Sequence, residues 1–311
     1  MRFYNAEEIE ARLSMPALID ALETAFVAGH SAPPRLNARI PGGDGDRVLL
    51  AMPAFDVGGG LAVKLTALYP DNAARNLPVN RALIVMFSEE GAPEAALDGT
   101  IITHLRTGAT SALASRYLSR ADSRSLLLIG TGALAPYMAL AHCAARPIEQ
   151  IAVWGRDQSR AAQTVERVRA KLDPRIEVRV CEDLAERAAR ADIISCATSA
   201  KTPVLRGAWL RPGAFVDLVG AFTPDAREID DDGVLRARVF VDGFAGAMEE
   251  AGDLLDPMRR GVIGRDKIEG ELADLIARRC DGRRDDAEIT LFKSVGAAIE
   301  DLAAARLAMR A

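Results

Sequence analysis

The second half of the chain, from about residue 125 onward, alternates short apolar runs with amphipathic segments. The runs resemble strands that are buried on both faces, and the segments between them carry apolar residues at helical spacing. The predicted strands are 126–130, 151–155, 176–181, 192–197, 214–221 and 238–242. The clearest helices between them are 133–146 and 157–171. This alternation predicts an α/β domain with a doubly wound, Rossmann-type parallel sheet.

The first half of the chain has a different pattern. Apolar residues at near-helical spacing predict one helix over residues 6–29, which the Pro33-Pro34 pair ends. Turns rich in Gly, Asp and Pro then separate three β-like segments, at 47–52, 60–69 and 81–88. A further helix is predicted over 100–119. This half therefore predicts a mixed α+β domain, a small sheet with flanking helices.

The last part of the chain returns to helical patterns. Residues 266–279 are predicted to be helical, and a polar loop then precedes the apolar run that starts at Ile289. An amphipathic helix begins at Ser294, and we expect it to pack back on the first half. With 311 residues the chain is long for one core, so two domains are expected.

Composition and charge exclude several classes of partner. The apolar fraction of 49% and charged fraction of 27% fit a soluble globular protein. A net charge of −5 and a pI near 5.4 argue against nucleic acid or an anionic membrane as the main partner. No apolar run approaches the roughly 20 residues of a membrane span, and the acidic N-terminus lacks a signal-peptide core. We expect a cytoplasmic protein.

The cysteines and histidines indicate no disulfide framework and no metal centre. The four cysteines are scattered without a Cys-x-x-Cys pair, at Cys143, Cys181, Cys196 and Cys280. Small buried thiols in a reducing compartment are the expected outcome. The three histidines, which share no metal-ligand spacing, are His30, His104 and His142.

One glycine motif stands at the start of the alternating half. The apolar run 126–129 leads directly into Gly130-Thr131-Gly132, and a helical pattern follows at once. In a dinucleotide site the first glycine makes a tight turn and the second lets the backbone approach the pyrophosphate. A small third residue, here Ala135, lets helix and strand pack closely. Short glycine patterns arise by chance, but the strand, helix and further strands supply the required context. We predict that Gly130, Thr131, Gly132, Ala133 and Leu134 hold a nicotinamide dinucleotide.

The end of the next predicted strand bears on the choice between NAD and NADP. NAD-preferring sites place an acid there to bind the ribose 2′-hydroxyl, but this chain has Gly155 followed by Arg156. Arg156 would face a 2′-phosphate, or it is a surface arginine at the start of the next helix. The pattern favours NADP over NAD.

Two further strand ends are expected to line the cofactor crevice. Ala197 and Thr198 close the fourth predicted strand, near the point where the strand order reverses. Val219, Gly220 and Phe222 end the fifth, and we place them near the nicotinamide. For Thr198, capping of the following loop is an equal alternative.

In the first half, three basic residues stand in apolar or glycine-rich settings. Arg35 follows two prolines, Lys64 lies inside a strand pattern, and Arg106 lies in a helical segment next to Thr107-Gly108. Taken singly, Lys64 reads as an outward-facing strand residue and Arg106 as a helix-surface arginine.

Together these pieces resemble the ornithine cyclodeaminase/mu-crystallin family, from about residue 2 to residue 308. The matching elements, in chain order, are Pro34-Arg35, Met52-Pro53, Gly60-Leu-Ala-Val-Lys64, Asp71-Asn72, Leu77-Pro78, Asp98-Gly99, Thr103-His-Leu-Arg-Thr-Gly108, Gly130-Thr-Gly132 and Phe292-Lys-Ser-Val-Gly296. The glycine motif alone would not single out this family, whereas the ordered set does.

The resemblance implies an architecture and a group of activities. A substrate-binding and dimerisation domain would comprise 1–119 together with 290–311, and an NAD(P)-binding domain would comprise 120–289. Family members act on small α-imino or α-amino acids with a nicotinamide cofactor. They include ornithine cyclodeaminase, alanine dehydrogenase and the ketimine or Δ1-pyrroline-2-carboxylate reductases. A homodimer through the N-terminal sheet is also implied.

The resemblance further implies roles for individual side chains. Arg35 and Arg106 would clamp the substrate carboxylate, with Arg39 as a rival for the role of Arg35. Lys64 would contact the carboxylate or polarise the reacting centre, which makes Lys64 and Arg106 the candidate catalytic residues. Thr107 and Lys293 would approach the cofactor, and Ser294 the substrate.

One departure from the family pattern changes the expected chemistry. Ornithine cyclodeaminases carry an aspartate where this chain has Phe222, and phenylalanine cannot bind an ammonium or accept its proton. Asp225 lies three residues further on, in a position typical of a helix cap. The resemblance is therefore strongest to the reductases, with Δ1-pyrroline-2-carboxylate as leading substrate and Δ1-piperideine-2-carboxylate next. Ornithine cyclodeaminase, alanine dehydrogenase and a non-catalytic, crystallin-like NADPH-binding protein stay as alternatives.

Overall fold

The computed structural model describes residues 1–28, 30–41, 47–56, 60–75 and 77–311, and it divides into two compact units. Unit 1 comprises Met1–Arg106 with Ala297–Ala311, and unit 2 comprises Thr107–Gly296. These limits differ from the predicted domain limits, 119/120 and 289/290, because a long helix runs through the first boundary and a strand near residue 290 pairs within unit 2. Which of these residues bind substrate and which bind cofactor, the division that the sequence suggested, stays a prediction.

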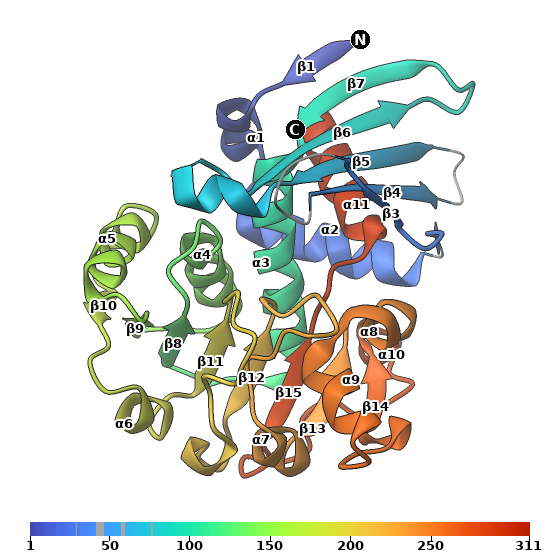
Figure 1. Cartoon of the computed structure of the whole chain (residues 1–311). Coiled ribbons are helices and arrows are strands. Elements are labelled where there is room, and N and C mark those ends of the chain that lie inside the picture. Colours follow the sequence, from blue (N-terminus) through green and yellow to red (C-terminus); the bar gives the residue numbers. More distant parts are fainter. Residues whose placement is uncertain (29, 42–46, 57–59, 76) are drawn as a thin grey trace. The chain divides into compact units, whose positions relative to one another are not determined.

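Among the described residues, unit 1 contains a seven-stranded, mainly antiparallel sheet (Figure 1). Its strands are β1 (Arg2–Tyr4), β2 (His30–Ser31), β3 (Leu36–Arg39), β4 (Val48–Asp56), β5 (Leu61–Leu68), β6 (Asn80–Phe87) and β7 (Pro93–Asp98). The order is β1-β7-β6-β5-β4-β2, and β3 also pairs with β4. Strands β4, β5 and β6 confirm the three predicted β-like segments.

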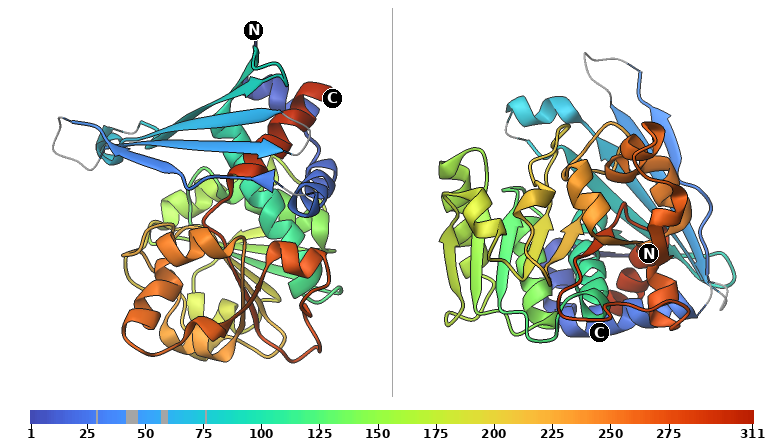
Figure 2. Two further views of the ribbon diagram at one scale, coloured as in Figure 1. Left: turned by 90° about the vertical axis from the view of Figure 1, so that its right-hand side faces the viewer. Right: turned by 90° about the horizontal axis from the view of Figure 1, so that it is seen from below.

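Helices cover one face of this sheet (Figures 1 and 2). They are α2 (Met15–Val27) and α11 (Ala298–Arg310), with the shorter α1 (Ala6–Arg12) beside β7. The 3-10 helix η1 (Pro70–Arg75) connects β5 to β6, and α3 (Gly99–Leu118) follows β7 in the chain. Helix α11 packs on α2 and on β4, β5 and β6, which confirms that the last helix folds back on the first half. Because strand side chains alternate, Ala62, Lys64 and Thr66 of β5 are buried on one face, whereas Leu65 points to the opposite face.

The single helix predicted over 6–29 was wrong, because two helices occupy this segment. The first ends at Leu13. The second begins after Ser14, whose hydroxyl accepts a hydrogen bond from the N–H of Ala17 at 3.4 Å, with Pro16 in its first turn. The apolar spacing continues across this break, so the periodicity alone does not reveal it.

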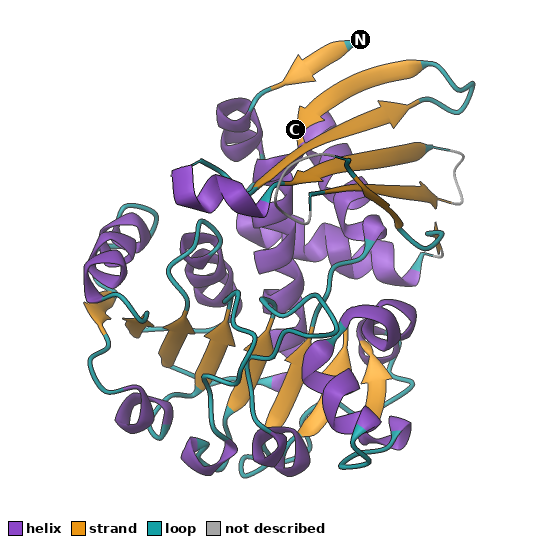
Figure 3. Cartoon of the chain, viewed as in Figure 1, coloured by secondary structure: helices purple, strands orange, loops and turns teal. Residues whose placement is uncertain are grey.

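Unit 2 contains an eight-stranded parallel sheet in the described structure (Figure 3). Its strands are β8 (Ser125–Ile129), β9 (Gln150–Trp154), β10 (Glu177–Val180), β11 (Ile193–Cys196), β12 (Phe215–Leu218), β13 (Arg238–Val241), β14 (Ile268–Glu271) and β15 (Thr290–Lys293). The order is β10-β9-β8-β11-β12-β15-β13-β14, so the direction of winding reverses between β8 and β11. The predicted α/β, doubly wound fold is therefore confirmed.

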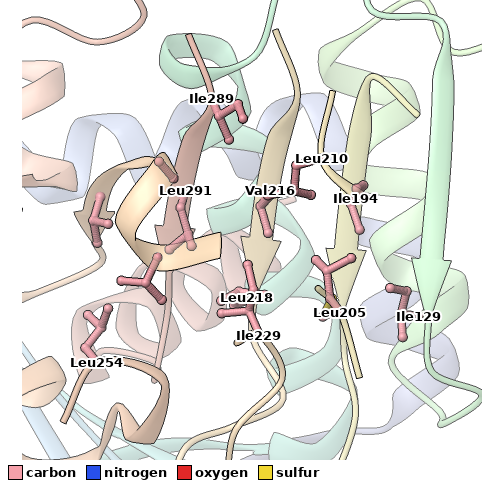
Figure 4. Close-up of a cluster of buried hydrophobic side chains, with 14 of the residues drawn as sticks. Ile129, Ile194, Leu205, Leu210, Val216, Leu218, Ile229, Leu254, Ile289 and Leu291 are labelled. Carbon is pink, nitrogen blue, oxygen red and sulfur yellow. The ribbon is translucent and has the colours of Figure 1, made fainter. Parts of the chain in front are cut away.

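Short helices connect these strands. They are α4 (Ala135–Ala145), α5 (Gln158–Arg169), α6 (Leu184–Ala188), α7 (Asp231–Arg236), α8 (Phe244–Glu250), α9 (Gly252–Arg259) and α10 (Leu272–Ile276), with 3-10 turns η2 (Gly207–Trp209) and η3 (Arg265–Lys267). The prediction of one helix over 266–279 was wrong, because η3, β14 and α10 share that segment. The apolar core of unit 2 runs along one face of the sheet, from Ile129 through Ile194 and Leu218 to Leu291 (Figure 4).

None of the helices in the described residues is long and apolar enough to cross a membrane.

Candidate functional site

The glycine turn after β8 lies where the strand order reverses. Gly130 has φ +129°, a conformation that side chains with a Cβ rarely adopt, and its N–H donates to the carbonyl of Trp154 at 2.9 Å. A Cβ on Gly130 would lie 2.5 Å from the carbonyl oxygen of Ala197, which follows the neighbouring strand β11. The two strand ends are thus as close as backbone allows, and they lie at the reversal of strand order, the place where α/β sheets bind nucleotides.

The start of α4 is open toward solvent. Gly132 and Ala133 are exposed, a Cβ on Gly132 would contact nothing within 4 Å, and the N-cap residue Leu134 provides no side-chain cap. Within the part of the chain that the structure describes, the N–H groups of these three residues donate no backbone hydrogen bond. Unused N–H groups at the positive end of a helix favour a phosphate. The turn therefore fits a pyrophosphate.

The end of β9 explains why no ribose-binding acid follows this strand. Gly155 follows β9, and a Cβ there would collide with the methyl group of Thr131. Arg156 is exposed and makes no ion pair or hydrogen bond with the described residues, whereas Asp157 caps α5 by accepting from the N–H of Ser159 at 2.9 Å. Arg156 is therefore a cation at this strand end without a partner among the described residues, and a second guanidinium, that of Arg167, donates to the carbonyl of Thr131 in the turn at 3.0 Å.

A buried glutamate joins the ends of β11 and β12. Glu228 is fully buried, and its Oε1 accepts from the N–H and the hydroxyl of Thr198 at 2.7 and 2.9 Å. Its Oε2 accepts from the N–H of Gly220 and of Ala221 at 2.8 and 3.1 Å. The hydroxyl of Thr198 donates to this carboxylate and also accepts from the N–H of Ala200 at 3.3 Å, which is the loop capping given as the alternative to a cofactor contact. Val219 is buried and Phe222 is partly exposed.

The last residue of β15 and the residue after it, which were predicted to approach cofactor and substrate, bind internal acids. The ammonium of Lys293 is fully buried and lies 3.0 Å from Oδ2 of Asp253. The hydroxyl of Ser294 donates to Oδ2 of Asp242 at 2.8 Å, and the same oxygen accepts two N–H groups that follow. Both side chains therefore make their polar contacts within unit 2, where they stabilise the fold.

In unit 1, Lys64 and Arg106 meet over two acids of α11. Nζ of Lys64 lies 2.7 Å from Oδ2 of Asp301, and Nε of Arg106 donates to Oδ1 of the same carboxylate at 3.2 Å. Nη1 of Arg106 donates to Oε2 of Glu300 at 2.6 Å. All four side chains are buried. The structure thus brings together the two candidate catalytic residues, and it excludes the surface alternatives for both.

Burial changes the acidity of Lys64. Desolvation lowers the pKa of its ammonium from the ordinary 10.5 to about 8, and Arg106 adds to this, while the carboxylate of Asp301 opposes it. A lysine with this pKa is charged at neutral pH and can still release a proton.

The register of the sheet shows which of the two arginines proposed to bind the carboxylate, Arg35 or Arg39, lies nearer to Lys64. Arg35 directly precedes Leu36, which pairs with Ala51, and the next residue of β4 pairs with Lys64. Arg39 lies at the other end of β3, opposite Val48. Arg35 is therefore the nearer of the two to the row of Lys64. Thr107, the residue after Arg106 in α3, is buried.

Sequence reasoning missed the acids of both clusters. Glu300 and Asp301 lie 194 and 195 residues from Arg106, so no local pattern connects them. A signal was present, because two adjacent carboxylates in a helix that is otherwise apolar on its packed side are unusual. In the sequence, Glu228 looks like an ordinary acid of a loop and Asp253 like an ordinary acid of a helix.

The matches to known proteins cover the whole chain. The family model described as the ornithine cyclodeaminase/mu-crystallin family matches residues 2–310. A Δ1-pyrroline-2-carboxylate reductase of Colwellia psychrerythraea is 39% identical over 98% of this chain and 97% of its own length. The Δ1-pyrroline-2-carboxylate reductase of Thermococcus litoralis, solved in complex with NADH and L-proline, superimposes with a TM-score of 0.95 at 36% identity, over 100% and 97% of the two chains. An archaeal alanine dehydrogenase dimer with bound NAD gives a TM-score of 0.91 at 29% identity, over 100% and 95%. This chain belongs to the ornithine cyclodeaminase/mu-crystallin family.

Proposed function

We propose that this protein is an NAD(P)H-dependent reductase of a small cyclic ketimine acid, converting Δ1-pyrroline-2-carboxylate to L-proline and, next in preference, Δ1-piperideine-2-carboxylate to pipecolate. The observation that carries the proposal is the buried cluster of Lys64, Arg106 and Asp301, in a chain that superimposes on a reductase bound to NADH and L-proline.

The cluster suits such a substrate because it holds charges of both signs. A protonated cyclic imine acid carries one carboxylate and one cationic nitrogen, and the cluster offers two cations beside two acids. Arg35 and Arg106 are proposed to hold the carboxylate. Lys64, whose ammonium has a pKa of about 8, is proposed to supply or tune the proton on the imine nitrogen. The bound nicotinamide supplies the hydride.

The surroundings of Phe222 favour reduction over cyclodeamination. Phe222 is 40% exposed and carries no acid or base. Asp225, the nearest carboxylate along the chain, has an exposed side chain that binds the hydroxyl of Thr223 at 2.8 Å and pairs with Lys201 at 3.6 Å. It is thus a surface residue. No amine-binding carboxylate replaces the aspartate of the cyclodeaminases at this strand end.

Arg156 supports NADPH as the preferred cofactor. The position that would carry the ribose-binding acid is Gly155, kept small by Thr131, and Arg156 is unpaired beside it. Arg156→Ala should weaken NADPH binding by about tenfold while leaving NADH binding nearly unchanged. Equal losses for both cofactors would contradict this role.

A homodimer through the uncovered face of the unit 1 sheet is also proposed. The strand register aligns Leu36, Ala51, Leu65 and Leu83 in one row across four strands, and the three leucines are exposed. Apolar residues repeated across neighbouring strands form a patch of the kind that a second copy covers. The archaeal alanine dehydrogenase relative is a dimer. The cytoplasmic location inferred from the sequence stays a prediction.

Absorbance at the nicotinamide band tests the reaction directly. Consumption of NADPH with Δ1-pyrroline-2-carboxylate, and no ammonia from ornithine, is the expected result. Lys64→Met should lower kcat by about 10²–10⁴-fold. Ammonia and proline from ornithine with catalytic NAD would identify a cyclodeaminase, and NADH formation with alanine a dehydrogenase. Tight NADPH binding without turnover of any of these compounds would identify a binding protein.

A further inference from the structure

Three strand ends of unit 2 are tied together by one chain of buried charges. The carboxylate of Glu228 accepts four hydrogen bonds from the loops that follow β11 and β12. Its own N–H donates to Oδ1 of Asp253 at 2.7 Å, and Oδ2 of that acid lies 3.0 Å from Nζ of Lys293, the last residue of β15. All three side chains are fully buried.

The two loops held by Glu228 approach each other without room for a side chain. A Cβ on Gly220 would collide with the backbone of Thr198 and with Oε1 of Glu228. Thr198 directly follows Ala197, whose carbonyl oxygen faces the glycine turn at Gly130. The loops therefore lie at the reversal of strand order, where α/β proteins bind their ligands.

We propose that Glu228 is a positioning residue that locks the loops after β11 and β12 into a single platform for the nicotinamide cofactor. The inference rests on the proposed function in its cofactor, but not in its substrate. Glu228 does not touch the cofactor. It acts through the backbone of Thr198 and Gly220, whose N–H groups its two oxygens hold in place.

Protonation would undo this lock. An ionised carboxylate accepts all four hydrogen bonds, whereas a protonated one turns an O–H toward N–H donors and loses part of the set. Burial, followed by the charge of Asp253, raises the pKa of Glu228 to about 7, while Lys293 and the Thr198 donors act against the rise. Burial, and after it the charge of Glu228, raises the pKa of the Cys196 thiol well above its ordinary value, so this neighbour stays uncharged. The platform is thus expected to loosen as the pH falls through 7.

Binding of NADH as a function of pH tests the proposal. NADH is the probe because it lacks the 2′-phosphate, which titrates near pH 6. If only the ionised form of Glu228 supports binding, the wild-type Kd should rise about tenfold between pH 8 and pH 6. Glu228→Gln should bind NADH about tenfold more weakly at pH 8 and show no such pH dependence. In turnover, its KM for NADH should rise while its KM for the ketimine stays the same.

Asp217→Asn is the matched control, because Asp217 is another fully buried carboxylate of the same sheet that accepts two serine hydroxyls at 2.8 Å. This variant should lose stability and keep the wild-type pH dependence of NADH binding. Thr198→Val provides a second variant in case Glu228→Gln does not fold. Loss of the hydroxyl donor should raise the pKa of Glu228 and move the binding transition to higher pH.

The outcomes are separable from those of the reaction test, since NADH binding requires no turnover. Equal NADH affinity and equal pH dependence in wild type and Glu228→Gln would overturn the proposal, as would a transition that does not move in Thr198→Val. A chain that binds NADH with the expected pH dependence but reduces no ketimine would overturn the proposed function alone.

Discussion

Replacing Asp301 by Asn should move the pH at which the enzyme loses activity. The fall of the Lys64 pKa from 10.5 to about 8 corresponds to about 3 kcal/mol of lost preference for the charged form, at about 1.4 kcal/mol for each tenfold change. The carboxylate of Asp301, 2.7 Å from Nζ, limits this loss. Without its charge, desolvation and the neighbouring guanidinium dominate, and the pKa of Lys64 should fall by about a further one to three pH units.

The sign of the effect on activity follows from the charge that the reaction needs. Lys64 is protonated below its pKa, so a step that needs its proton proceeds below pH 8 and fails above it. In Asp301→Asn the same loss should occur one to three pH units lower. Activity near pH 7.5 should therefore fall, while activity at pH 6 is retained to a larger extent.

The assay is the pH profile of kcat/KM for Δ1-pyrroline-2-carboxylate, measured on both proteins with saturating cofactor. Ionisation of the substrate affects both profiles equally, so it cancels in their ratio. Glu300→Gln is the matched control, because Glu300 is the adjacent buried acid but pairs with Arg106. It should shift the profile less. Lys64→Arg distinguishes the two roles of Lys64, since a guanidinium stays charged but donates no proton. Activity without an alkaline limb would mean that the charge suffices, and loss of activity that the proton is transferred.

An alkaline limb at the same pH in wild type and Asp301→Asn would refute the reasoning, because Lys64 would then not be the group that titrates. Loss of the acid also leaves a buried cation with fewer partners, at a cost of about 3–5 kcal/mol in the free energy of unfolding. Circular dichroism and a cooperative unfolding transition of the whole chain, unit 1 included, show that the variant is folded before its profile is interpreted.

Three further predictions address the fold and the assembly. Gly130→Ala should raise the Kd for NADH by more than about tenfold, because it forces φ +129° on alanine and brings a Cβ to 2.5 Å from the carbonyl oxygen of Ala197; unchanged binding in a fluorescence titration would contradict this. Leu65→Glu should convert the proposed dimer to a monomer in light scattering, whereas Leu235→Glu, at an exposed leucine of unit 2, should not. Equal masses for the two variants would argue against the proposed interface. Asp217→Ala should lower the free energy of unfolding in urea by about 3–5 kcal/mol, because it leaves two buried hydroxyls and a histidine without their acceptor; a change below 1 kcal/mol would show that these groups find other partners.

Local patterns predict the parts of the fold in which a single physical requirement governs each position. Strands buried on both faces must be apolar throughout, so β8, β9 and β11 are visible in the sequence. Strand β7, Pro93–Asp98, is rich in alanine and has no β-branched residue, and its pairing with β6 and β1 alone makes it a strand. Strand β14 carries glutamates and a glycine, so its segment was predicted to be helical.

In the candidate site, too, local patterns predict some residues, whereas the contacts of others depend on packing between distant segments. Gly130 is predictable because a tight turn against a neighbouring strand tolerates no other residue. Lys64 and Arg106 stand out in the sequence, but the side chains that set their charge are nearly two hundred residues away from Arg106 in the chain. Lys293 shows the limit most clearly. Its position at the end of β15 is consistent with a cofactor contact, yet its ammonium is buried against Asp253. Which neighbour a long side chain chooses is decided by packing that no local pattern contains.

The buried cluster around Lys64 and the one around Glu228 together define the pH range in which the enzyme should be active. Each cluster closes its ion pairs within its own unit, so a change in one should leave the titration of the other unchanged. Glu228 must be ionised to hold the cofactor platform, and its pKa is about 7. In the proposed reaction Lys64 must be protonated to serve the imine, and its pKa is about 8. At low cofactor concentration the rate should therefore follow a narrow bell-shaped curve between these values. Saturating NADH removes only the acid limb, because it compensates for weak binding but cannot restore a proton to Lys64.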